Sequence, residues 1–124
     1  FSASDMEHAV HTLAILHKEL CPEQEDQNRA KKLARTLENH IPILLASEFC
    51  EGAAHVMANQ INENAKQFSA RFAIPEMGHH LIEGFVYPTA GLNELCMVFC
   101  QSTLYHERNQ KRFHILENIA QKNV

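Results

Sequence analysis

The sequence predicts an α/β fold, a three-layer αβα sandwich around a mainly parallel sheet. Two continuous apolar runs, at residues 41–47 and 95–101, lack the polar alternation of a half-exposed strand. Such runs are typical of strands that are covered on both faces in a parallel sheet. Helical patterns lie before, between and after these two runs. Strands that alternate with helices form layered folds of this kind, so the order of the patterns indicates the architecture.

Two helices are expected ahead of the first strand. Ser2 or Ser4 can cap the first helix, because a hydroxyl there can accept a hydrogen bond from an unpaired amide of the opening turn. Pro22 and a polar stretch follow that helix. A second helix is predicted to start near Gln27 and to pack through an apolar side that ends at Leu37.

The remaining elements follow in alternation. A third helix opens at Glu51, with an apolar stripe that runs on to Phe68. Residues 71–74 are predicted to form a short strand that ends before Pro75, because proline has no N–H to donate to a neighbouring strand. One or two helical turns, a loop at 87–91 and a last helix complete the chain. The apolar residues on the inner face of that last helix are Phe113, Leu116 and either Ile119 or Ala120.

Composition excludes several classes of function. The 124 residues fit one domain, 1–124, and the first and last residues predict that it is a piece of a longer chain. A formal charge of -4, without a basic stripe, argues against nucleic acid as a partner. No apolar run approaches the roughly 20 residues of a membrane span, and no signal peptide is visible. We therefore expect a cytoplasmic protein with no membrane partner, whose four cysteines are free thiols.

A carboxylate on the third helix is the first candidate for chemistry. Glu63 lies three residues before Lys66, a spacing that is most often a solvated ion pair. Asn62 and Asn64 flank it, and small residues nearby would let another element approach closely. A partly buried carboxylate in such a place has a raised pKa and can exchange a proton near neutral pH. Both interpretations remain open on spacing alone.

A turn with two histidines is the second candidate. His79 and His80 follow Glu76, and Glu83 lies just beyond. A histidine in a turn is most often a surface residue, while the pair beside carboxylates also suggests a metal-centred hydrolase. The spacings do not match the patterns that place two imidazoles and a carboxylate on one ion. We predict no metal site, and the hydrolase remains the weaker alternative.

The segment that joins these candidates resembles a known family. It resembles the C-terminal sugar isomerase (SIS) domain of the bifunctional phosphoglucose/phosphomannose isomerases. In that family a strand leads to a helix that ends in the motif q-x-N-E-N-a/s-K. A short strand, a Pro-Glu turn and the pair His-Asn then follow. The spacing from Glu63 to His79 matches the family arrangement. The matching residues are Gln60, Asn62, Glu63, Asn64, Ala65, Lys66, Pro75, Glu76 and His79.

The resemblance implies an aldose/ketose isomerase of carbohydrate metabolism, as in glycolysis and gluconeogenesis. Its substrate would be glucose 6-phosphate or mannose 6-phosphate, converted to fructose 6-phosphate through an enediol. Glu63 would be the base that moves a proton between C1 and C2. His79 would assist ring opening, reaching the site from the other subunit of a homodimer. The resemblance implies no metal and no other cofactor.

Two departures from the family pattern limit what the chain can do alone. His80 stands where the family usually has asparagine. The serine/threonine-rich phosphate loop of the N-terminal half and the lysine near the family's C-terminus are not present in these residues. We therefore expect the 124-residue chain to be inactive, or nearly so, by itself. The alternative is a non-catalytic SIS-type module that binds a phosphosugar or mediates dimerisation.

Overall fold

The computed structural model describes residues 1–25 and 27–123 and divides the chain into two compact units, 1–38 and 39–124. The first unit contains α1 (Ala3–Leu20) and α2 (Arg29–Leu37). The elements of the second unit are β1 (Ile41–Ala46), η1 (Glu48–Cys50), α3 (Glu51–Gln60), η2 (Ile61–Ala65), β2 (Ala70–Ala73), α4 (Met77–His80), η3 (Ile82–Val86), α5 (Thr89–Leu92), β3 (Leu95–Phe99) and α6 (Glu107–Asn123).

Side-chain caps explain where the two helices of the first unit begin. The hydroxyl of Ser2 accepts from the amide of Asp5, and the Asp5 carboxylate accepts from the amide of Ser2 at 2.7 Å. The bond from the Ser2 amide, together with one that the Ser2 hydroxyl donates to the same carboxylate at 2.9 Å, lowers the pKa of Asp5. Asn28 caps α2 by accepting from the amide of Lys31 at 3.1 Å. The cap is therefore Ser2, and the second helix begins at Arg29, two residues after the predicted start.

The three strands of the second unit form one parallel sheet in the order β2-β1-β3. Ile43 in the central strand β1 lies opposite Ala70 on one side and Met97 on the other. The predicted parallel α/β sheet is thus confirmed. The prediction that the run 95–101 is a fully buried strand is wrong, because β3 is an edge strand and its side chains are only half-buried.

Helix α3 covers one face of this sheet. Leu44 and Ala46 of β1 point to that face and form a buried cluster with Ala54 and Ala58. The two alanines on α3 present only methyl groups, so the helix backbone can approach the sheet closely. Alternate residues of β1 thus pack against α3, as the two-residue period of a strand requires.

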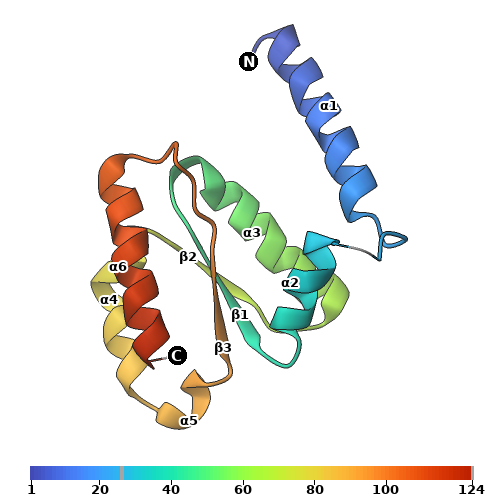
Figure 1. Ribbon diagram of the computed structural model, residues 1–124. Helices are drawn as coiled ribbons and strands as arrows, with labels where there is room; N and C mark the ends of the chain where they lie inside the picture. Colours follow the sequence, from blue (N-terminus) through green and yellow to red (C-terminus); the bar gives the residue numbers. More distant parts are fainter. Residues whose placement is uncertain (26, 124) are drawn as a thin grey trace. The chain divides into compact units, whose positions relative to one another are not determined.

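The other face of the sheet is covered by α4, η3 and α6. Ile43 and Leu45 point to this face, where they form the larger buried cluster with Met77, Phe113 and Leu116. Figure 1 shows α3 on one side of the strands and α4 and α6 on the other. Helices, sheet and helices form the three predicted layers, and the predicted inner face of α6 is confirmed.

A buried tyrosine links the ends of β1 and β3. Tyr105 is 3% exposed, and its hydroxyl donates to the carbonyl oxygen of Cys100 at 2.8 Å. The amide of Ser47 donates to the same hydroxyl at 3.5 Å. Burial, together with a hydrogen bond to Cys50, raises the pKa of Tyr105 to about 12. The phenol therefore stabilises the folded chain in its protonated form.

Replacing Tyr105 by phenylalanine is expected to cost about 1 to 2 kcal/mol at neutral pH, because two buried backbone groups lose a partner. Below pH 10 the phenol is protonated in both the folded and unfolded chains. Between pH 10 and about 12 only the unfolded chain ionises, so stability falls there by up to about 3 kcal/mol. Urea unfolding followed by circular dichroism at several pH values should show a shallower alkaline decline in Tyr105→Phe.

Tyr87→Phe is the matched control, since Tyr87 is 82% exposed. It should change neither the stability at neutral pH nor the alkaline decline. An alkaline decline in Tyr105→Phe as steep as in the unsubstituted chain would show that another group causes it.

Candidate functional site

Glu63 lies in η2, a π-helical turn at the end of α3. Single π turns occur often at functional sites because they change the direction of side chains within a helix. Lys66 ends the turn with a left-handed backbone, φ 55°, and its ammonium donates to the carbonyl oxygen of Glu63 at 2.6 Å. The side-chain amide of Asn64 donates to the side-chain oxygen of Gln60. The polar neighbours of Glu63 that the structure describes therefore stabilise the turn through other groups, and they form no hydrogen bond with the Glu63 carboxylate.

Asn62 anchors this turn to the start of β2. Its side-chain amide donates to the carbonyl oxygens of Ala58 and Ser69 at 2.9 and 2.8 Å and accepts from the amide of Ser69 at 3.0 Å. Asn62 is thus tied to the backbone by hydrogen bonds, and the next side chain, Glu63, is exposed. The expectation of a partly buried carboxylate does not hold in the single chain, because Glu63 lies in a turn before the start of β2, where its side chain is exposed.

His79 lies on the short helix α4, which begins directly after the Pro-Glu turn. Met77 is buried beneath the sheet face and fixes the helix, while His79 is exposed. His80 behaves differently, because its Nε2 lies 2.9 Å from Oε1 of Glu76. The two adjacent imidazoles therefore have different roles. Within residues 1–25 and 27–123, no group of three or more histidine, cysteine or acidic side chains is placed to hold a metal ion.

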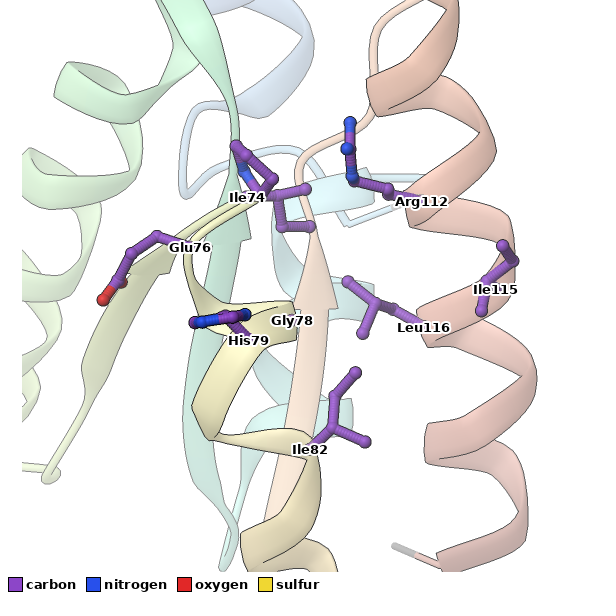
Figure 2. A pocket seen from close by; sticks show the side chains of 9 residues that line it. Ile74, Glu76, Gly78, His79, Ile82, Arg112, Ile115 and Leu116 are labelled. Atoms are coloured by element: carbon purple, nitrogen blue, oxygen red, sulfur yellow. The ribbon is translucent and has the colours of Figure 1, made fainter.

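A cavity of about 500 Å³ opens beside His79, between α4 and α6. Figure 2 shows Glu76, His79 and Ile82 on one side of it and Arg112 and Leu116 on the other. The floor is aliphatic, and the charged side chains lie near the end where the turn after β2 passes. The lining residues are Ile74, Pro75, Glu76, Gly78, His79, Ile82, Arg112, Ile115 and Leu116.

Glu63 and His79 lie at opposite ends of the sheet. Asn62 ties the Glu63 turn to Ser69, just before β2, whereas His79 follows Ile74, whose amide donates to the last residue of β1. The length of β2 alone corresponds to about 13 Å. They also lie on opposite faces, since α3 and α4 pack on different sides of the sheet. One copy of the chain does not bring these two side chains together.

The sequence did not single out Arg112 as a site residue. Its guanidinium donates to the side chain of Asn109 at 3.1 Å, and none of the ion pairs among the described residues involves it. A usable signal was present, because Arg112 immediately precedes Phe113, which the helical period places on the inner face of α6. A long basic side chain beside an inner position can reach the border of the core and whatever lies there.

Comparison with protein families identifies this arrangement. The family model described as "Bacterial phospho-glucose isomerase C-terminal SIS domain" matches residues 26–124, which include β1, α3, the Glu63 turn and the His79 helix. The chain belongs to this family. The resemblance predicted from the NENAK and Pro-Glu motifs is thereby confirmed. Searches of curated proteins and of solved structures gave no match.

Family membership relates the chain to sugar-phosphate isomerisation and indicates that it binds a sugar phosphate. The α/β fold of residues 39–124 is consistent with a truncated SIS-like domain. In the part of the chain that the structure describes, no helix is both long and apolar enough to span a bilayer.

Proposed function

We propose that this SIS domain supplies the base and the ring-opening residue of an aldose/ketose isomerase. The substrate is glucose 6-phosphate or mannose 6-phosphate, and the product is fructose 6-phosphate. Glu63 takes the proton from C2 and returns it to C1, while His79 exchanges protons with the ring oxygen and the C1 oxygen. Carboxylates and imidazoles both suit such transfers near neutral pH. The observation that carries the proposal is the family match, which includes both residues.

Two copies of the chain are needed to form the site in this proposal. Glu63 and His79 lie on opposite faces and ends of one sheet, so Glu63 of one copy must face His79 of the other. A two-fold dimer brings two such pairs together, because its interface uses the same surface of both subunits. The exposure of Glu63 supports this arrangement, since its carboxylate is free to meet a second copy.

The alternative is a module that binds a phosphosugar or mediates dimerisation without turnover. The exposure of Glu63 favours this alternative, because in a single chain the carboxylate is accessible to water. The two proposals differ in one respect that can be measured. Only the isomerase requires Glu63 and His79 to act on the same substrate molecule.

A mixing experiment tests the proposed function. The chain is joined to the N-terminal SIS half of a phosphoglucose isomerase, which supplies the serine/threonine-rich loop that the resemblance implies. Glu63→Gln and His79→Gln are each expected to be almost inactive. Random exchange makes half of the dimers mixed, and each mixed dimer holds one intact pair of two. The mixture should therefore recover about a quarter of the unsubstituted activity, measured as fructose 6-phosphate formed.

The control for this experiment mixes Glu63→Gln with Glu94→Gln, an exposed carboxylate just before β3 that has no role in the proposed site. Each mixed dimer of this control again holds one intact pair of Glu63 and His79, and each dimer of two Glu94→Gln chains holds two intact pairs. Activity in the Glu63→Gln and His79→Gln mixture that stays at the level of the separate proteins would exclude a site shared between copies.

A cytoplasmic location belongs to the same proposal. Cys21, Cys50, Cys96 and Cys100 are all free thiols. Free thiols are typical of proteins in a reducing compartment. Burial raises the pKa of Cys96 and of Cys100, which keeps these two thiols protonated and unreactive.

A further inference from the structure

We propose that the cavity between α4 and α6 is an anion site that binds a phosphate monoester through Arg112. The choice of a phosphate monoester rests on the proposed function, whereas the anion site itself rests on the geometry of this unit. The inference gives residues 39–124 a phosphate contact of their own. It assigns to Arg112 a binding role that is separate from the proton transfers at Glu63 and His79.

Within the part of the chain that the structure describes, the charge of Arg112 has only an indirect carboxylate neighbour, because Asn109 accepts from Arg112 and donates to Glu48 at 2.8 Å. A guanidinium stays protonated at all accessible pH values, and none of the ion pairs among the described residues includes Arg112. The one carboxylate that lines the cavity, Glu76, is already bonded to His80 at 2.9 Å. Figure 2 shows the Glu76 carboxylate directed away from Arg112. The cavity lining therefore includes an exposed arginine that no carboxylate of the described lining contacts.

The donors of Arg112 are available to a ligand. One Nη1 contact, to the side chain of Asn109 at 3.1 Å, holds the guanidinium near the second turn of α6. A guanidinium has five N–H donors in a planar fork, so most of them remain for an oxyanion. This fork matches two oxygens of a phosphate group, which gives shorter and stronger hydrogen bonds than neutral donors do.

The position of the cavity also fits a ligand site. It lies where β2 ends, and Arg112 is in the helix that follows β3, so it opens at the carboxyl ends of the parallel strands. Ligands of open α/β sheets bind outside these ends. The floor made by Ile82 and the buried Leu116 is aliphatic and therefore less polar than water, which strengthens an ionic contact at its rim. His79 also lines this cavity, from the α4 side.

The test measures phosphate binding by the 124-residue chain itself. Inorganic phosphate and glucose 6-phosphate are titrated into ¹⁵N-labelled protein at low salt, with the backbone amides of Gly78 and His79 as reporters. Both ligands should shift these signals with millimolar affinity, and glucose without phosphate should not. Arg112→Gln is expected to weaken binding by about tenfold or more, since a charge-assisted contact is lost. Arg112→Lys should recover part of the affinity.

Arg108→Gln is the matched control. Arg108 lies one turn earlier on α6, is exposed and does not line the cavity, so its loss removes the same charge from the same helix. Its affinity should stay within about twofold of the unsubstituted chain. Equal weakening in Arg108→Gln and Arg112→Gln would show a general charge effect and overturn the inference. Unchanged binding in Arg112→Gln would overturn it as well.

The outcome can be separated from that of the proposed function. Glu63→Gln should bind phosphate as the unsubstituted chain does, because Glu63 lies at the other end of the sheet. If Glu63→Gln loses isomerisation and Arg112→Gln binds phosphate normally, the proposed isomerase function is supported and the anion site is excluded. The reverse pair of results would keep the anion site and remove the isomerase.

Discussion

Replacing Glu63 by glutamine is expected to lower kcat for isomerisation by about 10² to 10⁴-fold, the usual contribution of a general base. Glutamine keeps the size of the side chain and can still form hydrogen bonds, but it cannot accept the proton from C2. Because Glu63 is exposed and its polar neighbours hold the turn without its carboxylate, folding should be unaffected. The assay uses glucose 6-phosphate with the chain joined to an N-terminal SIS half, as in the mixing experiment.

Affinity for the sugar phosphate separates catalysis from simple binding. Glu63→Gln should keep its affinity within about twofold, because the lost interaction is made in the transition state. Glu94→Gln, which also removes one exposed carboxylate, should keep both kcat and affinity. Turnover that survives in Glu63→Gln would rule out the catalytic role and leave the non-catalytic module as the function.

The second large effect is expected on stability. Phe113 on α6 is 2% exposed, and its ring lies 5.5 Å from that of Tyr105 and 6.3 Å from that of Phe99. Phe113→Ala leaves a cavity between α6 and the sheet and removes both ring contacts. The expected loss is about 3 to 5 kcal/mol, a large share of the 5 to 15 kcal/mol that holds a typical domain together. Urea unfolding followed by circular dichroism measures it.

Phe68→Ala provides the control for this prediction. Phe68 has the same side chain, but it is 68% exposed. Its replacement should change the free energy of unfolding by no more than about 0.5 kcal/mol. Similar losses in the two variants would show that α6 does not depend on the ring of Phe113 for its packing.

Local patterns predicted much of the second unit. The apolar run at 41–47 became the buried central strand β1, and the inner face of the last helix was found at Phe113 and Leu116. In β1 every side chain after Ile41 is buried, as an uninterrupted apolar run predicts, and in α6 the buried residues Phe113, Leu116 and Ala120 recur at helical spacing. Such a pattern depends only on the order of residues along the chain, so it can be recognised from the sequence alone.

Other local predictions failed at positions where the backbone changes direction. The apolar stripe of the third helix was extended to Phe68, but α3 ends at Gln60 and the π turn and the left-handed Lys66 follow. The loop predicted at 87–91 contains a short helix, α5. Such breaks depend on side-chain contacts between segments, as with Asn62 and Ser69, and periodicity does not report those contacts.

By itself the sequence determined the layered α/β class, the family and the two motif residues, Glu63 and His79, since each depends on residue types at fixed spacings. Only the tertiary structure decided that Glu63 and His79 lie at opposite ends and faces of one sheet, and that Arg112 shares a cavity with His79. The physical reason is that the connections between parallel strands place α3 and α4 on opposite faces, while β2 carries the chain from one end of the sheet to the other. The same connections bring α4 and α6, remote in sequence, side by side on one face.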